Sequence, residues 1–264
     1  MKANIDPTMS DSSHSGEAIP VAHRPEAALD DSVPAYQDDF PYALDNRLIL
    51  NWYPHRIMRL AKGRSLLELG LGHGYSSLIF SQHFPGYTVI EGSSAVIRQF
   101  QESHPQASLD IRCSYFEDFV APAPYDHIVM GFILEHVLDP GAILRRYRDF
   151  LTPGGSLFVS VPNCAALNKR LGYEAGMIGS LEELSDADRL LGHQRLFTVS
   201  SLRALCETAG FSVETIEGIF LKPIATHQIL KLKLSESILQ AMLKVGVDFP
   251  ELSVGILMEL HLTP

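Results

Sequence analysis

The stretch Ser65-Leu-Leu-Glu-Leu-Gly-Leu-Gly-His-Gly-Tyr75 decides the fold class of this chain. Its first five residues form a short apolar run, which is typical of a strand buried on both faces of a parallel sheet. Three glycines follow, and a helix is predicted from Tyr75 to His83. Glycines at a strand-to-helix turn let the backbone approach a ligand closely. The stretch therefore predicts an α/β domain that binds a ligand beyond its first strand.

The same alternation of short apolar runs and helical stretches continues along the chain. The predicted strands are Ser65–Leu69, Tyr87–Glu91, Leu109–Cys113, His127–Gly131, Ser156–Val161, Ser212–Ile216 and Gly255–Leu262. The predicted helices are Tyr75–His83, Ser94–His104, Gly141–Leu151, Ser200–Ala209 and His227–Val245, and a further helical pattern begins near residue 43. This order predicts a doubly wound, mostly parallel sheet of seven strands with helices on both faces.

The organisation along the chain is that of a tail followed by one domain. Residues 1–34 are rich in Ser, Asp, Pro and Ala without an apolar period, so we expect a disordered tail. Residues 35–264 are expected to form the domain. Segments 164–198 and 219–254 break the alternation and are predicted to be insertions or cap elements.

Each of these two insertions contains one helical apolar pattern. In the first, Leu181–Leu191 is a candidate lid helix. In the second, an inward packing face is expected from Leu230, Leu234, Ile238, Met242 and Val245, and a homodimer contact is the alternative use of that face.

Composition narrows the classes of partner. The net charge is −10 without a basic stripe, which argues against a nucleic-acid partner. No apolar run is long enough to cross a membrane, and no signal peptide is evident. Cys113, Cys164 and Cys206 lack metal or redox spacing, so we expect free thiols, a cytoplasmic location and no bound metal.

The spacing of the glycines argues against a dinucleotide site. A dinucleotide fingerprint needs glycine where this chain has Tyr75. Glu68, two residues before the first glycine, would repel a pyrophosphate but suits the ammonium group of an amino acid. Glu91 ends the second strand, where an acid can accept hydrogen bonds from ribose hydroxyls. Together these residues indicate a nucleoside joined to a zwitterionic amino acid.

The chain resembles the class I S-adenosylmethionine-dependent methyltransferases of the small-molecule type. The motifs that carry this resemblance are Glu68-Leu-Gly-Leu-Gly-His-Gly74, Glu91, Phe116-Glu117-Asp118, the segment Tyr125–Val137 with its Glu135-His136-Val137 ending, Leu151-Thr-Pro-Gly-Gly-Ser-Leu157, Gly192-His193-Gln-Arg-Leu-Phe-Thr198 and Ala209-Gly210-Phe211. Each motif alone is weak, but their order and spacing together are specific. The resemblance covers roughly residues 60–163 and resumes near residue 192.

The resemblance implies S-adenosylmethionine as cofactor and a last strand inserted antiparallel beside the fifth. The cofactor-binding residues that we expect are Glu68, Gly70, Gly72, Gly74, Glu91, Gly92, Phe116, Glu117, Asp118, Gly131 and Phe132. For Glu117 and Asp118, either acid could reach the adenine while the other is solvated.

The acceptor is expected to be a small molecule, with O-methylation slightly favoured over N-methylation. His136 and His193 are candidate catalytic and substrate-contacting residues because an imidazole can remove a hydroxyl proton near neutral pH. Tyr42 is a further substrate candidate, and 164–198 with Tyr36–Leu48 is expected to close over the site. The alternative function is a catalytically inactive methyltransferase-like partner or regulatory subunit.

Overall fold

The computed structural model describes residues 42–263. The predicted tail, and residues 36–41 of the segment expected to close over the site, lie outside the described residues. One sheet has the strand order β3-β2-β1-β4-β5-β7-β6. Its strands are β1 (Ser65–Leu69), β2 (Gly86–Glu91), β3 (Ile111–Cys113), β4 (Tyr125–Gly131), β5 (Leu151–Pro162), β6 (Phe211–Ile219) and β7 (Gly255–Leu262). The first five strands pair in parallel, whereas β7 is antiparallel to both β5 and β6. The predicted doubly wound sheet, including its antiparallel last strand, is confirmed.

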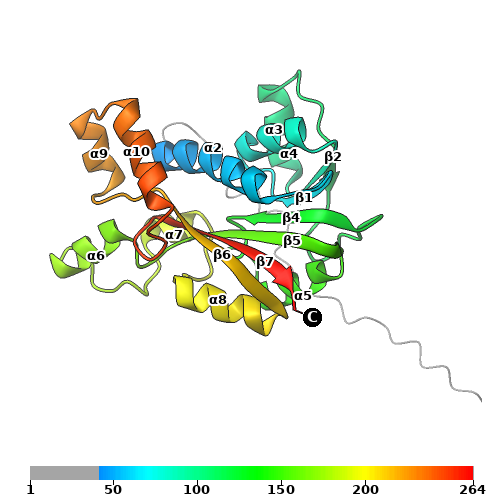
Figure 1. Ribbon diagram of the computed structural model, residues 1–264. Coiled ribbons are helices and arrows are strands. Elements are labelled where there is room, and N and C mark those ends of the chain that lie inside the picture. Colours follow the sequence, from blue (N-terminus) through cyan, green and yellow to red (C-terminus); the bar gives the residue numbers. More distant parts are fainter. Residues whose placement is uncertain (1–41, 264) are drawn as a thin grey trace, which may run out of the picture.

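Helices cover both faces of this sheet (Figure 1). On one face lie α2 (Ala43–Leu60), α3 (Tyr75–His83), α4 (Ser94–Ser103), α9 (Thr226–Leu232) and α10 (Glu236–Gly246). On the other face lie α5 (Pro140–Arg148) and α8 (Val199–Thr208). The short helices α6 (Leu167–Glu174) and α7 (Asp186–Leu190) lie beside the end of the sheet where the parallel strands terminate (Figure 1).

Each face of the sheet has its own apolar core. Tyr147 of α5 and Leu202 of α8 are fully buried against one face. Tyr53 of α2 and Phe80 of α3 are buried against the other. The central strands are apolar on both sides because both sides are covered, as the run at residues 65–69 predicts.

The predicted helix His227–Val245 is wrong, because the segment forms two helices. Lys233 has φ +47° and ends α9. The apolar positions of α10 are therefore not in helical register with those of α9. The expected packing face is right only in part, because Leu234 and Met242 pack against the core while the other three residues do not. The buried apolar side chains of the two helices are Ile229, Leu239 and Leu243, whereas Leu230, Ile238 and Val245 are 56%, 48% and 47% exposed.

The predicted lid helix Leu181–Leu191 is shortened to α7, which begins only at Asp186. Ser185 and Asp188 form a capping box that fixes this start. Three other elements differ from their predicted bounds by three residues or more at one end. Strand β5 begins five residues early, strand β6 continues to Ile219, and α5 ends at Arg148.

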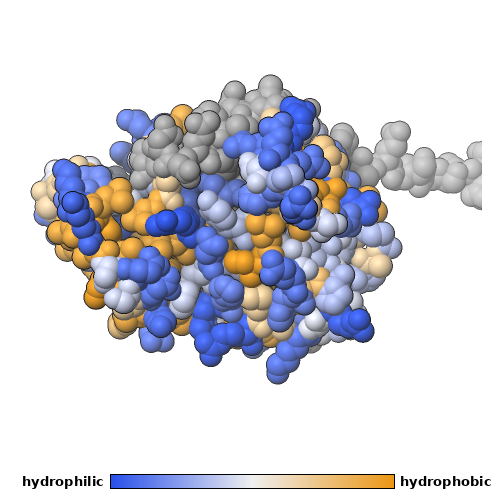
Figure 2. Space-filling model, turned by 90° about the horizontal axis from the view of Figure 1, so that it is seen from above, coloured by the Kyte–Doolittle hydropathy of each residue, from blue (hydrophilic) through white to orange (hydrophobic). Residues whose placement is uncertain are grey.

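Exposed apolar side chains gather at the end of the molecule that carries α9 and α10 (Figure 2, left). They include Leu230, Leu232, Ile238, Val245 and Phe249. A homodimer contact through this surface remains a proposal. Between residues 42 and 263, the structure contains no helix with the length and apolar character needed to cross a membrane.

Candidate active site

A cavity of about 320 Å³ lies at the carboxyl ends of β1, β2 and β4. Strand β1 lies between β2 and β4, so the chain winds outward in opposite directions from this point. Such a switch point is where open α/β sheets bind ligands. The sheet side of the cavity is formed by residues 70–76, Glu91, Ser93 and residues 131–133. Helix α2 and residues from the two predicted insertions complete the wall.

A second cavity of about 70 Å³ adjoins the first. Glu91, Phe116 and His136 line both cavities, so the two form one elongated site. The smaller cavity is also lined by Gly92, Tyr115, Glu117, Val137 and Leu138. It lies between the ends of β2 and β4, where the resemblance predicts the adenine.

The glycine loop has the backbone that its sequence predicts. Gly70, Gly72 and Gly74 have φ values of +84°, +49° and +76°, a region that L side chains rarely adopt. A Cβ on Gly70 would also lie 2.7 Å from Cδ1 of Ile133. At the end of β4, a Cβ on Gly131 would lie 2.3 Å from the Tyr53 hydroxyl. Glycine is therefore required by conformation and by space on this side of the cavity.

Glu68 lies behind the loop, and it is not among the residues that line either cavity. Its carboxylate is 1% exposed and accepts hydrogen bonds from Ser76 Oγ at 2.6 Å, Ser77 Oγ at 2.7 Å and the Tyr87 hydroxyl. Burial raises the pKa of Glu68 to about 7, against the opposite effect of these hydroxyls. The predicted contact of Glu68 with the cofactor, direct or through bridging water, stays a prediction. Glu68 holds the first turn of α3, and with it the loop.

Glu91 both faces the ligand site and fixes its wall. Its carboxylate accepts the backbone N–H of Leu71 at 3.0 Å and of Ser93 at 2.8 Å. The residue is 9% exposed, and burial raises its pKa although backbone donors oppose that shift. One side chain therefore links the end of β2 to the glycine loop.

The structure distinguishes the two acids after β3. Glu117 is buried and lines the smaller cavity, whereas Asp118 is exposed and lines neither cavity. Phe132, after β4, lines the larger cavity and has φ +59°, which is rare for a bulky residue. Its ring packs edge-on against Tyr53 at 5.8 Å between centroids.

Glu135, His136 and His193 form a cluster on the wall of the larger cavity. The rings of His136 and His193 lie 4.8 Å apart at 75°, and His136 Nε2 lies 3.9 Å from Oε1 of Glu135. Glu135 is 1% exposed, and neither of its carboxylate oxygens has a hydrogen-bond partner among the described residues. Burial raises the pKa of Glu135 to about 8, and the backbone N–H of Glu135 and the Arg195 charge only partly oppose this.

Arg195 brings His193 into the cluster. Its guanidinium donates to the carbonyl oxygens of Leu134, Val137 and Leu138, all in the turn after β4. The backbone N–H of Gln194 donates to the carbonyl of Glu135 at 2.7 Å. The motif Gly192–Thr198 is therefore bound to the turn that carries His136, although some 57 residues separate the two along the chain.

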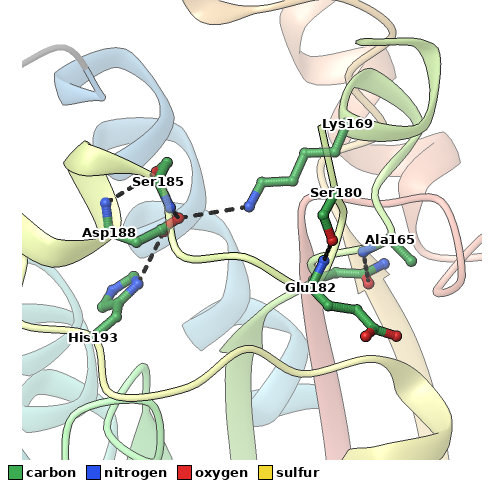
Figure 3. A network of polar contacts seen from close by, with 8 residues as sticks. Ala165, Lys169, Ser180, Glu182, Ser185, Asp188 and His193 are labelled. Carbon is green, nitrogen blue, oxygen red and sulfur yellow. Dashed lines mark hydrogen bonds and ion pairs between the residues drawn. The ribbon is translucent and has the colours of Figure 1, made fainter. Parts of the chain in front are cut away.

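Asp188 orients His193 (Figure 3). Its Oδ1 lies 3.1 Å from His193 Nδ1, while Oδ2 accepts the Ser185 hydroxyl at 2.6 Å. Lys169 of α6 reaches to 3.8 Å from the same Oδ2. Burial would raise the pKa of Asp188, but the bonds from His193 and Ser185 and the Lys169 charge hold it below its ordinary range. The Asp188 carboxylate is thus ionised. Because it pairs with Nδ1 of His193, the ring nitrogen of His193 that this pair does not use is Nε2.

The far wall contains a buried ion pair that sequence reasoning missed. Lys222 Nζ pairs with Asp45 Oδ2, and Thr226 Oγ1 donates to the same oxygen at 2.9 Å. Asp45 and Lys222 line the cavity, as does Tyr42, whose pKa is raised by burial and by Asp188 and Asp45. The only signal in the sequence was a lysine within an apolar stretch, because its partner is 177 residues away.

The sheet order, the antiparallel β7, the glycine loop and the acid ending β2 define the fold of the class I methyltransferases. A family model described as a methyltransferase domain matches residues 44–216. The chain therefore belongs to the S-adenosylmethionine-dependent methyltransferases, enzymes that use S-adenosylmethionine as methyl donor.

Among its relatives, a probable S-adenosylmethionine-dependent methyltransferase of Mycolicibacterium smegmatis is 26% identical over 166 residues. That match covers 62% of this chain and 58% of the relative, which is less than two thirds of the relative's length. A ubiquinone biosynthesis O-methyltransferase of Pseudomonas paraeruginosa is 28% identical over 187 residues, covering 69% of this chain and 78% of that protein.

Two solved structures share the fold. The CcbJ methyltransferase from Streptomyces caelestis has a TM-score of 0.59 at 15% identity, over 88% of this chain and 96% of that one. A possible histamine N-methyltransferase from Thermotoga maritima has a TM-score of 0.58 at 16% identity, over 89% and 96% of the two chains.

Proposed function

We propose that this enzyme transfers a methyl group to a hydroxyl oxygen of a small molecule bound in the larger cavity. The observation that carries the proposal is the cluster of Glu135, His136 and His193, which faces that cavity beside the glycine loop. An acceptor hydroxyl must lose its proton during or after transfer, and this cluster places proton-accepting groups where the acceptor would bind. The name of the O-methyltransferase relative agrees with this choice.

The residues present fit S-adenosylmethionine. Glu91 offers its carboxylate to the ribose hydroxyls, and Gly92, Phe116 and Glu117 form the smaller cavity proposed for adenine. The loop at Gly70, Gly72 and Gly74 leaves room for the amino acid part of the cofactor. When bound, the cofactor supplies a methyl carbon that its sulfonium makes electrophilic.

The chain's own contribution is then to position the acceptor and to receive its proton. Holding two reactants in line can lower a barrier by roughly 7–11 kcal/mol. Asp45, Lys222 and Tyr42 form a polar patch on the far wall that can orient an acceptor by hydrogen bonds. Ile49, Leu50 and Phe132 provide apolar surface beside it. An acceptor that combines an aromatic or aliphatic body with polar groups suits this lining.

Segment 164–198 is proposed to cover this site when the acceptor is bound. Lys169 and Asp188 line the cavity, and their ion pair links α6 to α7. A cover of this kind excludes water from the reacting groups and helps to complete the acceptor pocket.

Panels of phenols or alcohols and amines with matched carbon skeletons test the proposed acceptor class. Release of S-adenosylhomocysteine should be faster with hydroxyl acceptors. With such an acceptor, His136→Ala and His193→Ala should each reduce turnover by about 10²–10⁴-fold. Faster turnover of amines would contradict O-methylation. Full turnover in both histidine variants would exclude their role in proton removal.

A further inference from the structure

We propose that Glu135, His136 and His193 bind a divalent first-row transition metal that ligates the acceptor oxygen. This inference rests on the proposed function, and it replaces the expectation that the chain has no metal site. One atom from each of the three side chains lies within 4.8 Å of the other two. Two imidazoles and one carboxylate are a donor set that such ions accept, with positions left for a substrate oxygen.

The strongest observation is the state of Glu135. A carboxyl group that is 1% exposed normally has hydrogen-bond partners, because burying it without them costs free energy. Neither carboxylate oxygen of Glu135 has one among the described residues, although the residue lines the cavity. Arg195, the nearby cation, donates instead to backbone carbonyls. His136 Nε2 lies 3.9 Å from Oε1, which is beyond hydrogen-bond length, so a metal ion would give this carboxylate a direct partner.

Asp188 supplies the support that a metal-binding histidine commonly has. In metal sites, the second ring nitrogen of a ligating histidine usually donates to a carboxylate, which fixes the tautomer and the ring orientation. His193 Nδ1 lies 3.1 Å from Asp188 Oδ1, and the Asp188 carboxylate is itself held by Ser185 and Lys169 (Figure 3). This arrangement leaves Nε2 of His193 as the ligand atom.

The cluster must contract to bind an ion. Ligand atoms about 2.1 Å from a tetrahedral ion are roughly 3.4 Å apart, which is closer than the present 4.8 Å limit. His136 can make that adjustment because its side chain is 32% exposed, whereas Glu135 and His193 are buried. A modest turn of the His136 ring would bring Nε2 toward Oε1 of Glu135, from which it is 3.9 Å away.

The chemistry that follows is Lewis-acid activation of the acceptor. With the ion bound, His136 and His193 act as ligands and not as bases. A hydroxyl bound to the ion loses its proton more easily, and that proton passes to solvent water, so the cluster still brings about the deprotonation that the proposed function requires. The oxygen–methyl bond forms as the carbon–sulfur bond of the donor breaks, and no oxidant or reductant is consumed. The acceptors favoured are those with a phenol or a hydroxyl next to a second oxygen, since two oxygens can chelate the ion.

Titration of the chelator-treated full chain with Co²⁺ tests the site directly, because the visible absorption of Co²⁺ reports its ligands. We expect one ion per chain. Glu135→Gln and His193→Ala should abolish the saturable absorption, and Asp188→Asn should weaken Co²⁺ binding by about 10–100-fold. His55→Ala, at an exposed helical histidine, is the matched control and should bind like the unchanged protein.

Calorimetry with S-adenosylhomocysteine on the same variants should give unchanged affinity, which would show that their fold and cofactor site are intact. Absence of a saturable Co²⁺ site, or equal Co²⁺ affinity in Glu135→Gln and the unchanged protein, overturns the metal proposal. Undiminished O-methylation after chelation also overturns it, while leaving the proposed function in place. Stoichiometric Co²⁺ binding in a protein that methylates only amines would instead refute the proposed function.

Discussion

Replacement of Glu91 by Ala tests the cofactor assignment most sharply, since this carboxylate has two separable tasks. Toward the ligand, it is placed to accept bonds from the ribose hydroxyls. Toward the protein, it accepts the backbone N–H groups of Leu71 and Ser93. The first task affects cofactor affinity, and the second affects the stability of the loop.

The magnitude of the affinity change follows from the charge. A hydrogen bond to a charged group contributes about 1.5–3 kcal/mol, so Glu91→Ala should weaken binding by roughly 10- to 150-fold. S-adenosylmethionine and S-adenosylhomocysteine should be affected equally, because both contain the same ribose. Glu91→Gln keeps the shape and one acceptor oxygen, so its loss should be smaller, about 5- to 12-fold.

The protein also loses stability in Glu91→Ala. Leaving two buried N–H donors without an acceptor costs about 1–3 kcal/mol each, unless water from the cavity replaces the carboxylate. Calorimetry should therefore be performed well below the lowered melting temperature. Unchanged affinity for both compounds would refute the assignment. A loss confined to S-adenosylmethionine would place Glu91 near the sulfonium instead of the ribose.

Four further results are expected. Gly72→Val should abolish cofactor binding in a folded protein, because its φ of +49° is strained for a β-branched residue; near-normal affinity by calorimetry would reject the loop assignment. Glu68→Gln should gain stability relative to the unchanged protein as pH rises from about 4.5 to about 7, by up to about 3 kcal/mol. In that pH window the Glu68 carboxyl keeps its proton in the folded protein but loses it in the unfolded chain, which lowers the stability of the unchanged protein. A difference in melting temperature between Glu68→Gln and the unchanged protein that stays constant with pH would contradict the raised pKa. Arg195→Ala should speed hydrogen exchange in residues 134–138 and 192–197 and weaken cofactor binding, because Val137 and Leu138 line the smaller cavity; unchanged exchange would show that its three carbonyl bonds do not hold the segments together. Hydrogen exchange in 164–198 should slow only when S-adenosylhomocysteine and acceptor are both present, whereas high protection in the free protein would indicate a rigid wall.

The sheet could be predicted because its information is local. The apolar run Ser65–Leu69, the glycines after it and the helix Tyr75–His83 lie together in sequence, and all match the structure. Helices begin as predicted where the sequence has a definite signal, such as Ser93 capping the start of α4. The pattern failed over 227–245 because one residue in the left-handed region, Lys233, reset the helical phase, and apolar spacing alone does not reveal such a break.

The site was predictable to the extent that it lies at strand ends. Glu91, the glycines and Phe116 follow from their positions after β1, β2 and β3. Glu68 sits at the same motif, but its orientation depends on Ser76, Ser77 and Tyr87 packing around it. Asp45 with Lys222, and Asp188 with His193, were not predicted as pairs. The first joins distant elements, and the second belongs to an insertion without a strong pattern.

Incubation of the enzyme with a metabolite extract and methyl-deuterated S-adenosylmethionine tests the central claim most directly. Mass spectrometry of the products should find the trideuteromethyl group on the oxygen of a small molecule, with S-adenosylhomocysteine formed in equal amount. The label should be absent when Gly72→Val replaces the unchanged enzyme. Label on nitrogen or carbon, or a protein that binds the cofactor without transferring its methyl group, would contradict the account.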